Sequence, residues 1–185
     1  MTGVDSLRGK LLVASPAIVD PNFRRSVVLL AEHSDAGAMG VVLDRASEAT
    51  VGEVVAGLAW LVGEDSGVFV GGPVSATAVT VLAEFSDTQR AALLIEDDLG
   101  FVPAQVEDEE GLAAAVGRTR VFAGHAGWAP GQLEAELADD GWIVADALRE
   151  DCFTEDPEAL WETVLRRQGG TFSLIATMPH DPSLN

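Results

Sequence analysis

The densest group of residues that could bind a ligand lies in the stretch FAGHAGWAPGQLEAEL, at positions 122–137. It combines three glycines with a histidine and a tryptophan: Gly124, His125, Gly127, Trp128 and Gly131. A glycine-containing turn that leads into a helix N-terminus can bind a phosphate or carboxylate through free backbone N–H groups. These glycines match neither the G-x-G-x-x-G pattern nor the P-loop, and no Lys follows them. The spacing therefore favours a strand-to-helix corner over an anion site.

The residues that follow predict how this corner is built. With the helix cap at Ala129, Pro130 occupies the first helical position and Gln132 the third. From there the Gln132 side chain can reach back to the N–H of Ala129. Trp128, one residue before the cap, is then placed to pack on Leu133 as a hydrophobic staple. We therefore predict that Trp128 and Gln132 stabilise the corner.

A second group offers an acid, a base and a nucleophile in consecutive positions: Glu32, His33, Ser34 and Asp35. Neighbouring side chains on a regular strand point to opposite faces, so Glu32 and His33 cannot act on one target. The chain also has no G-x-S-x-G turn of the kind that presents a catalytic serine. We therefore predict a polar hairpin end, with His33 hydrogen-bonded to the backbone, in place of a catalytic triad.

A metal site would have to draw on the histidines, which are His33, His125 and His180. Neither the H-x-x-x-H spacing nor a pair of cysteines is present. A site would require His33 and His125 to meet in the fold with Asp20 nearby. We predict no metal and no cofactor.

Two turns contain further candidates. Asp20-Pro21-Asn22-Phe23-Arg24 has the composition of a turn, in which Phe23 would anchor the loop and Arg24 would be exposed. Gly71-Gly72-Pro73 ends an apolar run and lacks both the Lys and the helix cap that a phosphate cradle needs. We therefore expect structural turns at both places.

Short apolar runs predict the strands that must position these residues. They lie at residues 11–15, 26–33, 38–44, 67–71, 76–85, 90–96, 120–124, 142–147 and 171–176. Helices are predicted from Thr50, over 107–117, after Pro130 and from Asp156, where capping side chains or a proline mark most beginnings. The short loop 34–37 predicts an antiparallel hairpin. Early strands and later helices indicate an α+β domain with a mixed, largely antiparallel sheet.

Composition limits the class of protein. The 185 residues fit a single domain, 1–185, and 30 acidic against 11 basic residues give a formal charge of −19. Such a surface repels phosphate backbones, so we expect no direct nucleic-acid binding. Without a secretion signal or a membrane-length apolar run, we expect a cytoplasmic protein with no membrane association. The single cysteine, Cys152, fits a reducing compartment.

Three motifs together resemble the YqgE/AlgH family of small bacterial proteins. They are GKLLVASPAIVDPNFRRSVVLLAEHSDAGAMGVVLDR (9–45), VFVGGPV (68–74) and FAGHAGWAPGQLEAELADDGW (122–142), and the match reaches PEALWETVL (157–165). The resemblance implies a mixed sheet bent into a pseudo-barrel with flanking helices. It implies no established activity, although one branch of the family is linked to transcriptional regulation.

Two positions depart from the family pattern. Asp44-Arg45-Ala46 stands where the family commonly has Asn-Arg-Pro, and His125 stands where it commonly has Tyr. Because Tyr titrates near pH ~10 and is a poor base at neutrality, the resemblance favours a structural role or a ligand contact for His125 over a general base.

These observations favour a non-catalytic binding or regulatory module that acts through a protein partner or a small ligand, with any effect on transcription indirect. The alternative is a hydrolase-type enzyme with a cleft formed by residues 20–24, 33 and 124–128. One deep pocket with perturbed titratable groups would favour the enzyme, whereas a shallow groove with exposed apolar residues would favour partner binding. The candidate binding residues are Asp20, Phe23, Arg24, His33, Arg45, Gly72, Gly124, His125, Trp128 and Gln132.

Overall fold

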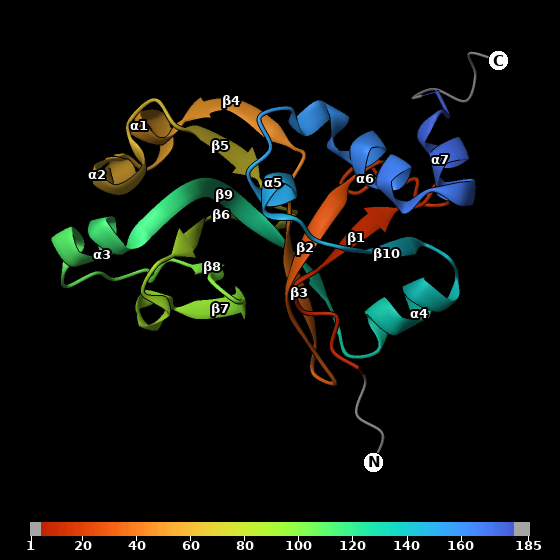
Figure 1. Cartoon of the computed structure of the whole chain (residues 1–185), viewed down its shortest axis with the longest axis horizontal. Coiled ribbons are helices and arrows are strands. Elements are labelled where there is room, and N and C mark those ends of the chain that lie inside the picture. Colours follow the sequence, from red (N-terminus) through yellow and green to blue (C-terminus); the bar gives the residue numbers. More distant parts are fainter. Residues whose placement is uncertain (1–4, 180–185) are drawn as a thin grey trace.

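A bent sheet of ten strands organises the molecule (Figure 1). The computed structural model describes residues 5–179. Its strands are β1 (Lys10–Ala14), β2 (Val27–Ser34), β3 (Gly37–Val42), β4 (Ala46–Thr50), β5 (Gly67–Val70), β6 (Val74–Phe85), β7 (Leu93–Glu96), β8 (Leu99–Phe101), β9 (Val116–Trp128) and β10 (Trp142–Asp146). Along the sheet they follow the order β10-β1-β2-β3-β9-β6-β8-β7. Outside this path, β5 pairs with β9, and β4 pairs with β5.

The long strand β9 joins the two parts of this sheet. Its C-terminal part pairs antiparallel with β3, where Gly40 lies opposite Ala126. Its N-terminal part pairs antiparallel with β6 and parallel with β5. The path ends at β10 and β7, which do not pair with each other within residues 5–179, so the sheet bends without closing. The predicted α+β fold with a mixed, largely antiparallel sheet is therefore confirmed.

Strand β1 is covered on both faces by apolar side chains. Leu11 and Val13 belong to a core inside the bend, which also contains residues of β2, β3, β7 and β8. Leu12 and Ala14 point the other way, into a second cluster that includes Trp128. Burial on both faces explains why this strand is apolar at every one of these positions rather than at alternate ones.

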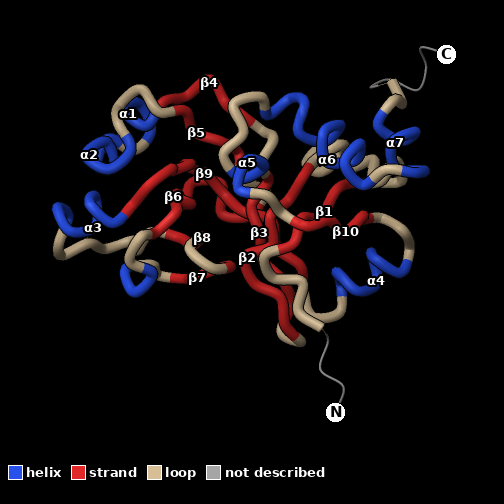
Figure 2. The backbone as a smooth tube through the Cα atoms, viewed as in Figure 1, coloured by secondary structure: helices blue, strands red, loops and turns tan. Residues whose placement is uncertain are grey.

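In the described part of the chain, residues 5–179, seven short helices flank the sheet (Figure 2). They are α1 (Val51–Val54), α2 (Ala59–Val62), α3 (Glu109–Ala115), α4 (Gln132–Ala138), α5 (Arg149–Cys152), α6 (Leu160–Gln168) and α7 (Gly170–Ala176). The helix predicted from Asp156 is present: α6 buries Leu160, Trp161, Val164 and Leu165, and Asp156 caps the turn before it by accepting a hydrogen bond from the Ala159 N–H at 3.3 Å. Among residues 5–179, no helix is long and apolar enough to cross a membrane.

The C-terminal run 171–176 is a helix, α7, so the prediction of a strand there is wrong. Its β-branched and aromatic residues are typical of strands. In the fold this segment follows α6 directly and packs beside it, and Ile175 and Ala176 reach the main core. Tertiary packing of these two residues therefore outweighs the local preference for an extended chain.

The helix predicted from Thr50 is only partly correct. The capping interaction is present, because the Thr50 N–H donates to Glu53 Oε2 at 2.9 Å. The helix ends after one turn, and its last residue, Val54, is exposed. Adjacent β-branched residues and Gly57 have low helix propensity, which explains why α1 and α2 are separate short turns. Strands β4 and β8 and helix α5 have no counterpart among the predictions.

Strand β9 extends through the glycine-rich stretch instead of ending at residue 124. Gly124 adopts φ +74°, a left-handed conformation that glycine tolerates and that bends the strand locally. Pairing then resumes with β3, where Ala38 lies opposite Trp128. The residues predicted to form the turn before the corner are thus strand residues, and the corner itself begins after Trp128.

Candidate functional site

The candidate residues lie at several places in the fold. One groove is lined by Asp20, Phe23, Trp128 and Gln132, and a separate cavity is lined by Arg24 and Arg45. His33 lines a third cavity, which Trp128 also lines. The remaining candidates, Gly72, Gly124 and His125, lie where β9 passes the start of β6. Of the segments in the hydrolase alternative, 20–24 and 124–128 meet in the first groove, but none of these three cavities is lined by all three segments.

We call the first place the aromatic groove, which is defined by Phe23, Trp128 and Trp142. The Trp128 and Trp142 rings meet edge to face with centroids 5.9 Å apart, and Phe23 lies 6.2 Å from Trp128 and 5.8 Å from Trp142. The rings come from the β1–β2 loop, the end of β9 and the start of β10. The cavity beside them has a volume of about 440 Å³. Edge-to-face contacts at these distances are favourable aromatic geometry.

Glu136 on α4 organises the polar atoms of the aromatic groove. Its Oε2 accepts hydrogen bonds from both indole N–H groups, at 3.0 Å from Trp128 and 2.7 Å from Trp142. Its Oε1 accepts a hydrogen bond from the Gln132 amide at 2.9 Å. Each indole N–H therefore has an acceptor, as expected for tryptophans that are only 6% (Trp128) and 5% (Trp142) exposed.

The corner that carries these residues agrees in part with its prediction. Gln132 Oε1 accepts the Ala129 N–H at 3.0 Å, as predicted, and Trp128 and Leu133 share one apolar cluster. The helix, however, begins at Gln132 with Gly131 as its cap, so the predicted cap at Ala129 is wrong. Gly131 adopts φ +77° and adds a turn after Pro130, a conformation that residues with a Cβ rarely adopt.

The rim of the aromatic groove carries both apolar and acidic side chains. Val19 is 79% exposed and lies with Ile18 on the β1–β2 loop. Asp20 and Asp139 are exposed and line the same cavity. This surface can accept an apolar side chain that is accompanied by positive charge.

His33 is buried, and both of its ring nitrogens have hydrogen-bond partners. Nδ1 accepts the Leu7 N–H at 2.9 Å, so this nitrogen carries no proton. The proton is therefore on Nε2, which donates to Glu134 Oε1 at 2.8 Å. This hydrogen bond is the main reason that the pKa of Glu134 is lowered. The predicted backbone contact of His33 is confirmed, and neither nitrogen is free to act on a substrate.

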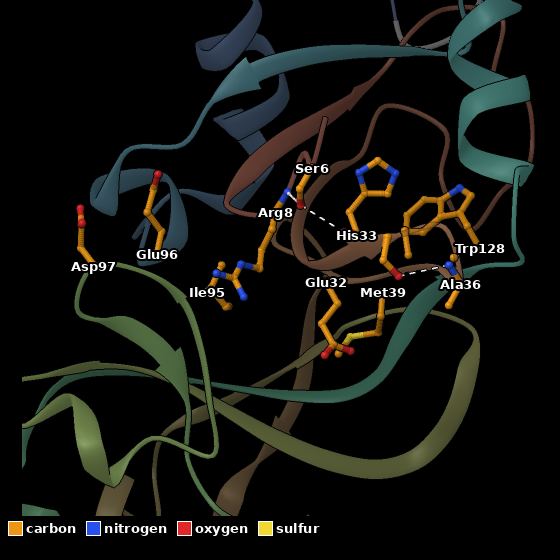
Figure 3. Close-up of a pocket in the computed structure, with 13 residues that line it drawn as sticks. Ser6, Arg8, Glu32, His33, Ala36, Met39, Ile95, Glu96, Asp97 and Trp128 are labelled. Atoms are coloured by element: carbon orange, nitrogen blue, oxygen red, sulfur yellow. Dashed lines mark hydrogen bonds between the residues drawn. The ribbon is translucent and has the colours of Figure 1, made fainter. Parts of the chain in front are cut away.

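The third cavity, which His33 lines, does not supply His33 with a catalytic partner. It has a volume of about 980 Å³ and includes Arg8, Glu32 and Glu96. Figure 3 shows the His33 ring and the Glu32 carboxylate directed to opposite sides of β2. Glu32 is exposed and His33 is buried, so although both residues line this cavity, their side chains leave opposite faces of β2, as the alternation of a strand predicts.

The glycines at the start of β6 and in β9 are explained by close backbone contact. A Cβ on Gly72 would lie 2.2 Å from the carbonyl group of His125. A Cβ on Gly124 would lie 2.4 Å from the carbonyl oxygen of Gly72. Neither distance permits a side chain, so both glycines allow two backbone segments to pass each other. His125 is partly buried on β9, opposite Val74.

We call the cavity lined by Arg24, Arg25 and Arg45 the arginine cleft; its volume is about 720 Å³. Asp44 lies at its inner wall with 4% of its side chain exposed, 3.3 Å from the Arg45 guanidinium, and accepts the Val27 N–H at 3.2 Å. Burial raises the pKa of Asp44 to about 6, although Arg45 and the Val27 N–H act to lower it.

Two further observations concern nucleophiles and metals. Cys152 is buried, and burial raises the pKa of its thiol to about 12, so it does not supply a thiolate at neutral pH. Among residues 5–179, no group of three His, Cys, Asp or Glu residues is placed to hold a metal ion. His180 lies outside the described residues.

Five residues of the aromatic groove and the arginine cleft were not among the candidate binding residues of the sequence analysis: Arg25, Asp44, Glu136, Trp142 and Trp161. The adjacent pair Arg24-Arg25 was a usable signal, because the chain has only 11 basic residues. The role of Glu136 had no local signal, since its partners Trp128 and Trp142 lie on two different strands.

Comparison with known proteins gives consistent results in sequence and structure. Residues 11–173 match the protein-family model described as AlgH-like. A UPF0301 protein from Streptomyces coelicolor is 47% identical over 191 residues, covering 100% of this chain and 98% of the relative. A UPF0301 protein from Mycobacterium tuberculosis is 41% identical over 181 residues, covering 96% of this chain and 90% of the relative.

Two solved structures resemble the whole fold. A crystal structure of a Corynebacterium diphtheriae protein matches with a TM-score of 0.84 at 32% identity, covering 96% of this chain and 95% of that one. The solution structure of the AlgH protein from Pseudomonas aeruginosa matches with a TM-score of 0.73 at 28% identity, covering 98% of both chains. The similarity thus includes the bent sheet together with the segments that form the aromatic groove and the arginine cleft.

Proposed function

This chain belongs to the AlgH-like family, and on that premise we propose that it is a non-catalytic binding module that holds a basic segment of a protein partner in the aromatic groove. The observation that carries the proposal is the combination of an exposed apolar rim with a rigid aromatic floor. Val19 projects into solvent beside the groove, and Phe23, Trp128 and Trp142 form the floor. Aromatic residues of this kind are common anchors in protein interfaces.

The rigidity of the floor favours binding of a partner. Glu136 accepts both indole N–H groups and the Gln132 amide, so the rings are held before any partner arrives. A preorganised surface loses less side-chain entropy on association than a mobile one. The groove is therefore suited to a short segment that inserts one apolar side chain between the rim and the rings.

Charge determines the kind of segment. The chain has a formal charge of −19, and Asp20, Glu136 and Asp139 line the groove itself. Complementary charge speeds association and disfavours acidic partners. A segment with Lys or Arg beside an apolar anchor fits this surface, whereas a nucleic acid does not. Any influence on transcription would therefore pass through the protein partner.

Catalysis has less support from the geometry. Both nitrogens of His33 are occupied by Leu7 and Glu134, and the thiol of Cys152 is buried. In this proposal the protein acts in the cytoplasm, for which the single buried cysteine is supporting but not decisive.

The test compares two matched variants, Val19→Asp and Leu174→Asp, as immobilised baits in lysate of the source cells. Val19 is 79% and Leu174 is 70% exposed, and Leu174 lies on α7, away from the groove. We expect a protein that the wild type and Leu174→Asp retain and Val19→Asp loses. Its retention should fall as salt is added, because the contact is partly electrostatic, and cross-linking should place a basic segment of it against residues 18–23. Equal retention by both variants, or an acidic contact segment, would refute the proposal.

A further inference from the structure

We propose that the arginine cleft is a second binding site, for a small molecule that carries an oxyanion, either a phosphate or a carboxylate group. The cleft lies between the β1–β2 loop, the chain that follows β3, and α6 with the turn before it. Its volume of about 720 Å³ is within the range of small-molecule sites. It shares no lining residue with the aromatic groove, so the two proposals stand independently.

The concentration of arginines is the first reason. The chain has 11 basic residues against 30 acidic ones, yet Arg24, Arg25 and Arg45 line this one cavity. Most of the other basic residues are neutralised in ion pairs, for example Arg118 with Glu84 and Arg167 with Asp151. Within residues 5–179, neither Arg24 nor Arg25 forms an ion pair with a carboxylate. Their charges are therefore free to meet a ligand.

The arginines are also held in place. Arg45 Nη2 donates to the carbonyl oxygen of Arg24 at 2.5 Å, and this hydrogen bond links the two segments that carry the arginines of the cleft. The Arg25 guanidinium lies over the Trp161 ring at 3.9 Å and donates to the Met178 carbonyl at 2.8 Å. A planar guanidinium that is fixed in this way can bind a phosphate or carboxylate through two parallel hydrogen bonds.

The backbone is strained at one of the arginines that line the cleft. Arg25 has φ +54°, a left-handed conformation that is uncommon for a residue with a long side chain. The strained conformation places Arg25 against Trp161, while Arg24 stays exposed to solvent. Strained residues of this kind often occur at binding sites, where the surrounding structure maintains them.

The opposite wall is acidic, which narrows the class of ligand. Glu158 and Glu162 line the side formed by α6 and the turn before it, and Asp44 lies deeper, against Arg45. A ligand with a single oxyanion and a hydrogen-bond donor at its other end can satisfy both walls. A polyanion would meet the glutamates and is disfavoured.

The test is a ¹H–¹⁵N NMR titration of the full chain with sodium phosphate and, separately, with sodium acetate, which carries a single carboxylate. Sodium chloride at matched ionic strength is the reference for screening. The reporters are the backbone amides of Arg24, Arg25 and Arg45 and the indole N–H of Trp161, which donates to the Ala14 carbonyl. Arg24→Gln removes a free arginine of the cleft, and Arg8→Gln removes an exposed arginine elsewhere as the matched control.

We expect saturable shifts of these signals with phosphate or acetate that chloride does not reproduce. Arg24→Gln should weaken binding about tenfold, the usual effect of losing a charge-assisted contact. Arg8→Gln should leave it unchanged, and Asp44→Asn should strengthen it by removing a negative charge. Arg45→Lys, which keeps the charge but loses the paired donors, should weaken binding as well and provides a second test if Arg24→Gln does not fold.

The two anions also identify the source of the oxyanion. Tighter binding of phosphate indicates a phosphate ester, tighter binding of acetate indicates a carboxylic acid, and similar binding of both supports an oxyanion site without that distinction. The inference fails if neither anion exceeds chloride, or if Arg8→Gln and Arg24→Gln weaken binding equally.

Discussion

The aromatic groove and the arginine cleft use their polar groups in opposite ways. In the aromatic groove, Glu136 accepts three hydrogen bonds from the chain itself. In the arginine cleft, Arg24 and Arg25 have no carboxylate partner within residues 5–179, and Asp44 is buried at a cost that Arg45 only partly offsets. The groove is therefore part of what stabilises the fold, whereas the cleft keeps charge available at some expense of stability. Substitutions should separate the two regions by the sign of their effect on unfolding.

The largest loss of stability is expected for Trp128→Ala in the aromatic groove. Trp128 is only 6% exposed and contacts Phe23 and Trp142. Its truncation should cost about 3–5 kcal/mol, the range for a buried aromatic residue. Urea unfolding would measure this, with Trp60→Ala as the control, because Trp60 is 37% exposed and should cost less than about 2 kcal/mol. Similar losses for the two variants would show that the groove is not a structural element.

Glu136→Ala is the next test of the same region. It leaves the indole N–H groups of Trp128 and Trp142 without their acceptor, which should cost about 2–3 kcal/mol. Glu136→Gln keeps a carbonyl oxygen that can accept from both rings and should cost less than about 1 kcal/mol. The contrast between the two variants in thermal unfolding isolates the hydrogen bonds from the packing of the side chain. If the Gln variant is as unstable as the Ala variant, the negative charge of Glu136 matters more than its role as acceptor.

In the arginine cleft, by contrast, a substitution of Asp44 is expected to raise the stability of the folded protein. Burial raises the pKa of Asp44 from 3.8 to about 6, so the folded protein binds this proton more tightly than the unfolded chain. Stability associated with Asp44 is therefore highest below pH 3.8, falls as the pH rises towards about 6, and stays low above it. Asp44→Asn, which can still accept from Val27, should stabilise the protein by roughly 2 kcal/mol at pH 8 and have little effect near pH 4.

Urea unfolding at both pH values tests this assignment. The matched control is Asp146→Asn, because Asp146 is exposed and its pKa is lowered by Lys10. Neutralising Asp146 should not stabilise the protein at pH 8. A loss of stability in Asp44→Asn at pH 8 would mean that the Arg45 ion pair outweighs the cost of burial, and the two regions would then differ less than we argue.

The smallest effect is expected for Gln132→Ala at the helix corner. Gln132 is exposed, and its side chain connects the Ala129 N–H with Glu136. Loss of this capping contact should cost about 1 kcal/mol or less. Thermal unfolding should therefore rank Gln132→Ala well below Trp128→Ala. An equal or larger effect would move the stabilising role from the rings to the polar contacts of the corner.

Much of the fold could be predicted because local signals were sufficient. The hairpin at residues 34–37, the capping interactions of Thr50 and Asp156, and the reach of Gln132 to Ala129 depend on neighbours within a few residues. The strand of 171–176 was mispredicted for the same reason, since only packing against α6 and the core makes that segment helical. Local preference is decisive at caps and turns, and it is outweighed where a segment must cover a core.

The candidate residues show the same division. From the sequence, residues 20–24 were grouped with 124–128, and Phe23 and Trp128 do share the aromatic groove, whereas Arg24 lies in the separate arginine cleft. Glu136 and Trp161 lacked a sequence signal for these roles, because their partners are distant along the chain. Asp44 was noted only as a departure from the family pattern, and its burial beside Val27 became visible only in the fold.

By itself the sequence determined the family, the α+β class, the acidic charge and the structure of individual caps and turns. Only the tertiary structure decided which side chains meet. The bend of the sheet brings residues 20–25 beside Trp142 on one side and beside Arg45 and Trp161 on the other. It also buries Asp44 while leaving Asp20 in water. Burial and convergence depend on how strands far apart in the chain pair and curve, and that information is not present in any short stretch of residues.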